Sequence, residues 1–164
     1  VYLGVRAALG WAFDNDDPKG RTIAIQGVGA VGGPLAERLA EAGATVYAAD
    51  RNQKRLDALT EKHGVKQVKA EEILSMECDL LAPCALGGIL NDESIPELRT
   101  KVVAGAANNL LLKPEHGKAL SEASSTPPTT SSTPVASSTS PSSSTTAATT
   151  KKWRFARSSA FRKR

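Results

Sequence analysis

The strongest indication of the fold is the stretch Thr22-Ile23-Ala24-Ile25-Gln26-Gly27-Val28-Gly29-Ala30-Val31-Gly32. Its first five residues are largely apolar and rich in β-formers, which predicts a buried parallel strand. In the glycine turn that follows, Gly27 allows a tight bend, Gly29 lets the backbone approach a pyrophosphate, and Gly32 lets a helix pack closely. The spacing alone is a weak signal, but here a strand precedes it and a helical pattern follows. We therefore expect a phosphate-binding site at residues 27–32.

The residues after the turn predict a helix from about Val31 to Ala42, because apolar side chains recur there at helical spacing. Gly43 is well placed to end this helix. The free N–H groups and the positive dipole at its start favour a bound phosphate.

A second predicted strand, residues 45–49, ends at Asp50. A carboxylate there can accept hydrogen bonds from ribose hydroxyls and would repel a 2′-phosphate, so NAD is favoured over NADP. Arg51 keeps NADP open, because a neighbouring arginine could bind that phosphate. In the alternative interpretation the glycines only form a tight turn, and Asp50 caps the next helix. The order of strand, glycines, helix, strand and acid favours the cofactor site.

Other segments alternate between helical and strand patterns. We expect helices over residues 1–13, 52–63, 70–76 and 113–121, a helical turn over 92–98, and strands over 65–68, 79–82 and 101–105. In the first helix, Val1, Val5 and Ala8 share a face with Trp11 or Ala12. This alternation predicts an α/β, Rossmann-type doubly wound parallel sheet. Segments 27–32, 83–88 and 104–109 would leave the carboxyl ends of its strands, where a dinucleotide lies.

Composition divides the chain into two parts. Residues 1–121 have a globular pattern and predict an NAD-binding domain, whereas residues 122–164 are Ser/Thr/Pro-rich and then basic, which predicts a disordered tail. Seven of the 21 Lys and Arg lie in the last 14 residues, so the rest of the chain has a net charge of −3. That balance gives no sign of nucleic-acid binding.

The two cysteines, Cys78 and Cys84, have no His or Cys partners at zinc spacing. We expect reduced thiols in a cytoplasmic protein and no metal. No apolar segment approaches the length of a membrane span, so we expect no membrane partner.

The segments GVRAAL, AIQGVGAVGGPLAERL, CDLLAPCALGGILND, KVVAGAANN and PEHG resemble the NAD domain of the glutamate/leucine/phenylalanine/valine dehydrogenases, most closely the leucine and valine members. The resemblance covers about residues 1–121. It implies oxidative deamination of an amino acid, with hydride transfer to NAD and release of ammonia and a 2-oxo acid. It also implies that the parent enzyme is a homo-oligomer.

By this resemblance, residues 27–32 hold the pyrophosphate and Asp50 the adenosine ribose, while Cys84 and Ala85 run beside the cofactor. Ala107 and Asn108 would lie near the nicotinamide ribose; alternatively, Asn108 is a loop residue bonded to its own backbone. Ala30 stands where many members carry Asn, and Leu110 where Gln often follows. The family's catalytic lysine and acid belong to an N-terminal domain that would precede Val1, so no residue here is assigned a catalytic role and the fragment alone is expected to be inactive.

The tail can be interpreted in three ways. It is a disordered linker or stalk, its basic end binds nucleic acid, or it is a frameshift product. Most Ser codons and all Thr, Pro and Ala codons share C as second base, a composition that a shifted frame of a GC-rich gene would produce. Shifted back-translation from Glu122 to Ser140 permits the string Gly-Ile-Leu-Tyr-Ala-Pro-Asp-Tyr-Val-Val-Asn-Ala-Gly-Gly-Leu-Ile-Asn-Val, which resembles the family's next segment. We therefore expect a frameshift near Ser121, which would leave the sheet truncated; the DNA sequence tests this.

Overall fold

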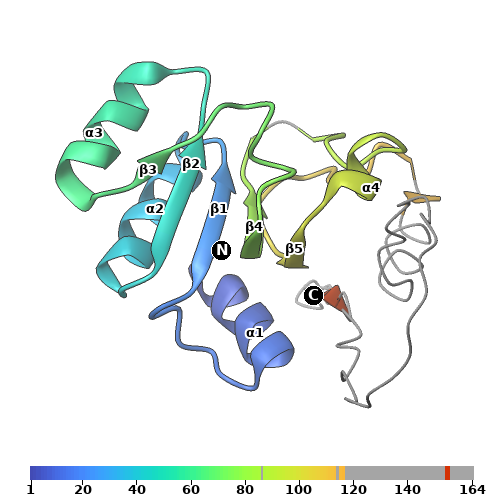
Figure 1. The fold of residues 1–164 in the computed structure, drawn as a ribbon, viewed down its shortest axis with the longest axis horizontal. Coiled ribbons are helices and arrows are strands. Elements are labelled where there is room, and N and C mark those ends of the chain that lie inside the picture. Colours follow the sequence, from blue (N-terminus) through green and yellow to red (C-terminus); the bar gives the residue numbers. More distant parts are fainter. Residues whose placement is uncertain (86, 114, 117–153, 156–164) are drawn as a thin grey trace, which may run out of the picture.

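The glycine turn lies at the end of the central strand of a parallel sheet (Figure 1). The computed structural model describes residues 1–85, 87–113 and 115–116, and the backbone of 154–155. The strands are β1 (Thr22–Gln26), β2 (Thr45–Ala49), β3 (Lys66–Gln67), β4 (Cys78–Pro83), β5 (Thr100–Val103) and β6 (Arg154–Phe155). They are ordered β3-β2-β1-β4-β5-β6, and every pair is parallel. The predicted Rossmann-type sheet is confirmed, and its order reverses between β1 and β4, where such sheets bind ligands.

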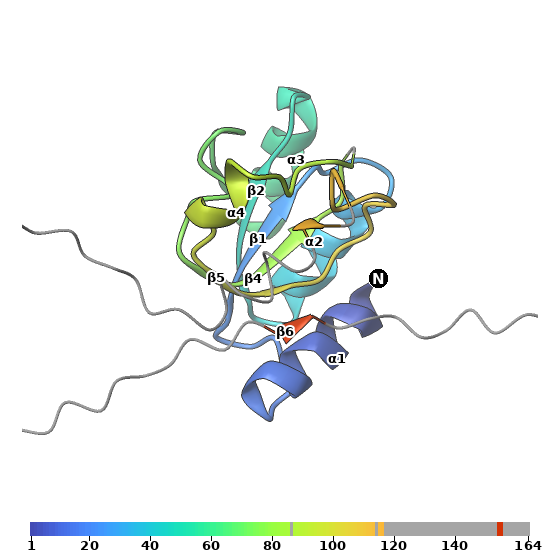
Figure 2. The same cartoon turned by 90° about the vertical axis from the view of Figure 1, so that its right-hand side faces the viewer.

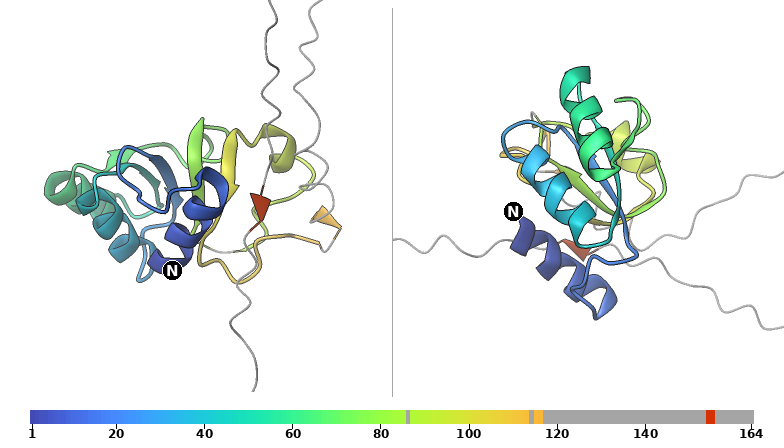
Figure 3. Two further views of the ribbon diagram at one scale, coloured as in Figure 1. Left: turned by 90° about the horizontal axis from the view of Figure 1, so that it is seen from below. Right: turned by 90° about the vertical axis from the view of Figure 1, so that its left-hand side faces the viewer.

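Three helices cover one face of the sheet: α1 (Tyr2–Phe13), α2 (Gly32–Glu41) and α3 (Gln53–His63). The core between them includes Ile23 and Ile25 of β1, packed with Leu9, Leu39 and Leu56 from the three helices. Figure 3 shows α2 and α3 side by side on this face. Each helix thus buries an apolar stripe against the strands, as amphipathic helices do.

The opposite face is covered by short irregular segments and by α4 (Ser94–Glu97). Ala24 of β1, Leu81 of β4 and Val103 of β5 point to this side, because successive side chains of a strand alternate between faces. They pack with Ile73 and Ile95. Figure 2 shows α4 and α2 on opposite sides of the sheet, so the sheet is covered on both faces, as predicted.

The predicted helix over residues 70–76 is wrong, since the structure has turns there. Two helical hydrogen bonds form, from Ile73 N–H to Lys69 C=O (3.2 Å) and from Met76 N–H to Glu72 C=O (3.0 Å), without continuing into a helix. A seven-residue segment is too short to sustain a helix by itself. Burial of Ile73 in the second core, rather than helical pairing, holds this segment in place.

The predicted inward face of α1 is only partly correct. Val5 and Ala8 are buried together with Leu9, but Val1 is 53% and Trp11 43% exposed. Val1 precedes the first helical residue, and of the two predicted alternatives Ala12, not Trp11, packs against the core, together with the buried Leu9. The boundaries of the other predicted elements within residues 1–113 agree with the structure to within two residues.

Most of the predicted tail and the predicted helix over 113–121 lie outside the described residues. Where the chain is described again, Arg154 and Phe155 form β6 and pair with Val102 and Val103. The outer edge of β5 offers unpaired N–H and C=O groups that an added strand can satisfy. Among the described residues, no helix is both long enough and apolar enough to cross a membrane.

Candidate functional site

The glycine turn leaves β1 at the centre of the sheet and is shaped by close backbone contacts. Gly27 has φ +89°, and a Cβ there would lie 2.8 Å from the Cβ of Ala85. Its N–H donates to the carbonyl of Ala49 (2.7 Å), which ties the turn to the end of β2. The tight turn assigned to Gly27 is therefore required by both its conformation and its surroundings.

Gly29 and Gly32 have no side chain for two different reasons. A Cβ at Gly32 would overlap the carbonyl oxygen of Gly27 and lie 3.0 Å from the Cβ of Cys84, so the protein itself excludes it. A Cβ at Gly29 would meet only the guanidinium of Arg55, at an ordinary 3.7 Å. The fold therefore does not demand glycine at position 29, and the space there is open to a ligand. Ala30 and Val31 are exposed beside it.

Asp50 joins the glycine turn to the end of β2. Its carboxylate accepts the N–H of Val28 (2.7 Å) and the N–H of Asn52 (2.8 Å). Burial raises the pKa of Asp50, but these backbone hydrogen bonds and the charge of Arg55 outweigh burial and lower it. The carboxylate thus stays ionised and is aimed at the turn. The helix that follows is capped by Asn52, whose side chain accepts the N–H of Arg55, so the capping role considered for Asp50 belongs to Asn52.

The segments after β4 and β5 are hydrogen-bonded to one another and to the end of β1. Cys84 N–H donates to Gln26 C=O (2.7 Å), and the carbonyl of Pro83 accepts N–H bonds from Ala106 (2.8 Å) and Ala107 (3.0 Å). Burial raises the pKa of the Cys84 thiol, so the thiol is protonated at neutral pH.

Further out, the two segments run side by side. Gly88 N–H donates to Asn109 C=O (2.5 Å), and Leu90 exchanges backbone bonds with Leu110 (3.1 Å) and Leu112 (3.0 Å). A hollow of about 420 Å³ lies between them, lined by Gly87, Gly88, Asn109, Leu111 and Leu112. Asn108 and Arg51, both predicted site residues, are exposed on the loops around the site.

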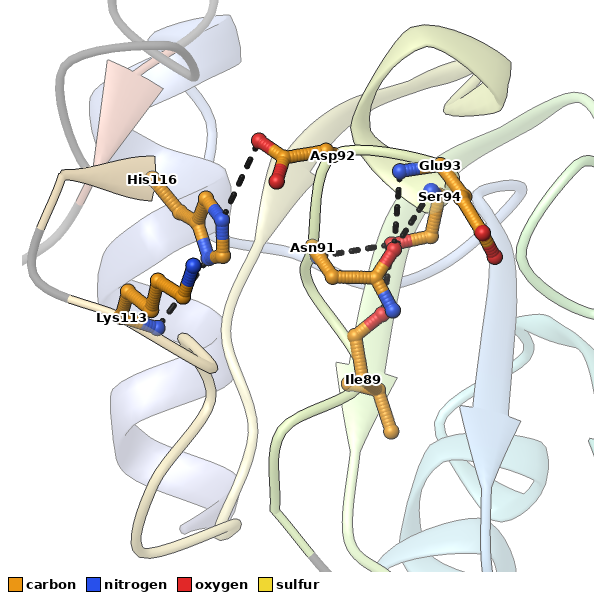
Figure 4. A network of polar contacts seen from close by, with 7 residues as sticks. All are labelled: Ile89, Asn91, Asp92, Glu93, Ser94, Lys113 and His116. Atoms are coloured by element: carbon orange, nitrogen blue, oxygen red, sulfur yellow. Dashed lines mark hydrogen bonds and ion pairs between the residues drawn. The ribbon is translucent and has the colours of Figure 1, made fainter.

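A polar network fixes the base of these loops (Figure 4). His116, only 3% exposed, accepts the N–H of Lys113 on Nδ1 (3.1 Å) and places Nε2 3.3 Å from a carboxylate oxygen of Asp92. The side chain of Asn91 accepts the N–H groups of Glu93 and Ser94, both at 2.9 Å. The contact between His116 and Asp92 joins the two segments, while the other bonds shape each segment locally.

The structure brings most of the predicted site residues together at one end of the sheet. Contacts or hydrogen bonds connect Gly27, Val28, Gly32, Asp50, Cys84, Ala85 and Ala107 to the turn or to its neighbouring loops. All of these lie at the carboxyl ends of β1, β2, β4 and β5, where a nucleotide binds in such sheets.

Sequence reasoning missed two residues beside the turn. Arg55, in the first turn of α3, brings its guanidinium next to Gly29. Gln26 has a buried side-chain oxygen, the one such atom among the described residues without a hydrogen-bond partner. A polar residue ending an apolar strand could have indicated Gln26, whereas no local pattern places Arg55.

The residues present fit a dinucleotide. Gly29 leaves open space at the start of α2, no side chain caps that helix, and an ionised carboxylate lies at the end of the neighbouring strand. Backbone N–H groups and the positive helix end suit a pyrophosphate, and a carboxylate suits ribose hydroxyls.

Comparison with known proteins agrees with this geometry. A family model described as "D-isomer specific 2-hydroxyacid dehydrogenase, NAD binding domain" matches residues 7–100. Leucine dehydrogenase of Geobacillus stearothermophilus is 44% identical over 122 residues, which cover 74% of this chain and 33% of that protein. Phenylalanine dehydrogenase of Bacillus thermotolerans is 41% identical over 127 residues, with the same shares covered.

The structure of L-tryptophan dehydrogenase from Nostoc punctiforme superposes with a TM-score of 0.71 and 35% identity, over 74% of this chain and 37% of that one. The chain thus spans about a third of the length of these curated relatives. The family model covers more than half of the chain, and the relatives add the resemblance to amino-acid dehydrogenases. This chain therefore belongs to the family described as the NAD-binding domain of D-isomer specific 2-hydroxyacid dehydrogenases, and its relatives include the leucine and phenylalanine dehydrogenases.

Proposed function

We propose that this chain is the cofactor-binding part of an enzyme that oxidatively deaminates a branched-chain or other apolar L-amino acid to its 2-oxo acid and ammonia. The observation that carries the proposal is the junction of the glycine turn with Asp50 at the centre of the sheet. The identity of 41–44% with leucine and phenylalanine dehydrogenases supports the reaction class. When bound, NAD would accept the hydride released from the amino acid.

In this proposal each part of the site binds one part of the cofactor. The pyrophosphate lies against Gly29 and the start of α2, and the adenosine ribose lies at Asp50. Cys84, Ala85, Ala107 and Asn108 border the nicotinamide half. The bonded loops after β4 and β5 support this arrangement, because they form one wall beside the turn.

Arg55 would contact the adenosine side of the cofactor. Its guanidinium lies beside Gly29, and its charge lowers the pKa of Asp50, so it faces both the phosphate position and the ribose position. Arginine suits a phosphate because it presents several N–H donors and a permanent charge. Arg55 thus fits the role that the sequence alone left open for Arg51.

The remaining parts of the reaction belong to the parent enzyme. Since the chain spans about a third of its relatives, we propose that the catalytic and substrate-binding residues come from outside this sequence. The parent would act on its small-molecule substrate as a homo-oligomer. Cytoplasmic location and the lack of a nucleic-acid partner remain predictions from the sequence.

The alternative is a catalytically inactive, stand-alone NAD-binding module. This alternative is favoured if these 164 residues act on their own, because none of them is assigned the role of the family's catalytic lysine or acid. Both interpretations predict NADH binding, and they differ in turnover once the missing part is supplied.

The test is a fluorescence titration of the 164-residue chain with NADH, with turnover of leucine, valine and phenylalanine followed in parallel. We expect binding without turnover. Failure to bind NADH would contradict the cofactor site, and turnover by this chain alone would contradict the assignment of catalysis to another part. Adding the N-terminal domain of the leucine dehydrogenase relative distinguishes the two interpretations, because only a competent half-enzyme would then turn over.

A further inference from the structure

Glu37, Glu41 and His63 form a cluster of possible metal ligands at the far end of α2 and α3. One oxygen or nitrogen atom from each side chain lies within 4.8 Å of the other two. His63 Nε2 lies 3.5 Å from Glu37 Oε1. Among the described residues this is the one group of three possible metal ligands that lie so close together. It differs from a cluster of carboxylates alone because it contains an imidazole.

The cluster lies away from the cofactor site. The helices α2 and α3 both begin beside the glycine turn, at Gly32 and Gln53, and run side by side (Figure 3). Glu41 and His63 are their last residues, and Glu37 lies one turn before Glu41. A ligand at this cluster would therefore join the ends of two helices without touching the turn.

The two glutamates are placed unfavourably for an isolated helix. They lie four residues apart on α2, where like charges repel each other. They also lie near its C-terminal end, where the helix dipole favours positive charge. The basic residue in the last turn of α2 is Arg38, and among the described residues no ion pair joins it to either glutamate. A bound cation would compensate both.

We infer that Glu37, Glu41 and His63 form a site for a divalent cation of the zinc type, which joins α2 to α3. Tetrahedral zinc with nitrogen and oxygen ligands at 2.0–2.2 Å needs ligand atoms roughly 3.4 Å apart. One pair is already at 3.5 Å, and the others lie no further apart than 4.8 Å. The side chain of Glu37 is 47% exposed and Glu41 is exposed, so both have room to close onto an ion.

The donor set favours zinc over magnesium or calcium. Magnesium and calcium prefer oxygen ligands alone, whereas imidazole with carboxylates suits zinc and its neighbours. Three protein ligands leave the remaining position to water. This site was not expected from the sequence, because the ligands come from two helices and do not follow a zinc spacing.

The test uses the full 164-residue chain, stripped of metal and titrated with Zn²⁺ by calorimetry, and with Co²⁺ as a spectroscopic probe. The decisive variant is Glu41→Gln. Among the described residues no ion pair involves Glu41, so this change leaves the link between His63 and Glu37 intact and removes only the third ligand. We expect zinc affinity to fall by at least about tenfold, the smallest loss typical even of outer-shell changes.

Glu61→Gln, on the exposed surface of α3, is the matched control and should bind zinc as the unmodified chain does. His63→Gln should abolish the Co²⁺ spectrum, while circular dichroism checks that it folds. Zinc should raise the melting temperature without changing NADH affinity. Equal zinc binding by the Glu41→Gln variant and the unmodified chain, or no zinc binding at all, would overturn the inference. His63 and Glu37 would then form only an ion pair. Neither outcome bears on NADH binding, which is tested separately.

Discussion

The two ends of the sheet use their polar groups differently. At the amino end, Asp79 accepts the N–H of Thr22 (3.0 Å) and the ammonium of Lys101 (2.9 Å), which connects β1, β4 and β5. Lys101 and Arg21 also lie over the ring of Phe13, at 5.4 and 4.0 Å from its centroid, which ties in α1. Every one of these groups has its partner within the protein.

At the carboxyl end, groups remain open to a ligand. Gly29 borders open space, Ala30 and Val31 are exposed, and the buried side-chain oxygen of Gln26 lacks a partner among the described residues. Buried polar groups are normally satisfied, so an unsatisfied one at this end indicates a place for an external partner. The polar groups at the amino end are thus satisfied within the protein, whereas the carboxyl end, where we propose that the cofactor binds, keeps groups without a protein partner among the described residues.

The largest effect is expected for Gly32→Ala, which should disrupt the packing of the glycine turn at the carboxyl end of the sheet. The new Cβ would overlap the carbonyl oxygen of Gly27, so we expect a loss of about 3 kcal/mol or more in the free energy of unfolding, together with loss of NADH binding. Urea unfolding measures the first and fluorescence the second. Gly4→Ala, where a Cβ meets nothing within 4 Å, is the control and should be neutral or slightly stabilising. A Gly32→Ala variant as stable as the unmodified chain would contradict the packing described.

Gly29→Ala should separate binding from stability. Its Cβ meets only Arg55 at an ordinary distance, so we expect an unchanged melting temperature. NADH affinity should fall by about tenfold or more, roughly 1.4 kcal/mol, because the backbone could no longer approach the pyrophosphate. A fall in melting temperature with unchanged affinity would show that glycine is needed here by the fold and not by the ligand.

Asp79→Asn should affect the amino end alone. We expect a loss of about 1 kcal/mol in stability near neutral pH and no change in NADH affinity per folded molecule. Burial raises the pKa of Asp79, but the hydrogen bond from Thr22 and the charge of Lys101 outweigh it and lower the pKa. The charged pair therefore stabilises above the ordinary Asp pKa of 3.8 and is lost as pH falls through the lower, folded-state value.

Urea unfolding of the Asp79→Asn variant and the unmodified chain from pH 7 down to acid measures this difference. The two stabilities should converge in the acid range, below the ordinary Asp pKa. A constant difference at all pH values would mean that the shape of the side chain, and not its charge, connects the strands.

The smallest effect is expected for Arg55→Gln. Because the guanidinium is exposed, its contribution is screened by water, and we expect NADH affinity to fall only about two- to threefold at low salt, and less at high salt. NADPH affinity should fall more, since a 2′-phosphate adds charge near Arg55. Titrations at two salt concentrations measure both. Arg51→Gln is the control; a larger effect of Arg51 than of Arg55 would reverse the assignment.

Elements that depend only on neighbouring residues in the sequence could be predicted from local sequence patterns. The strand before Gly27, the helix after it and the acid at position 50 were predicted from a short segment, because each depends on neighbours in sequence. The helix predicted over residues 70–76 failed, since burial of Ile73 overrides weak helical pairing. Arg55 was missed because its place depends on how α3 lies across the glycine turn.

The parallel α/β architecture and the glycine turn could be predicted from the amino-acid sequence, because turn geometry and strand alternation are short-range properties. Three features became visible only in the folded chain: the strand order that reverses beside β1, the hydrogen bond from Val28 to Asp50, and the contact of α2 with α3 at Glu37 and His63. These features join residues far apart in the chain. They depend on which strands pair and how the helices pack, and neither is written in any single segment.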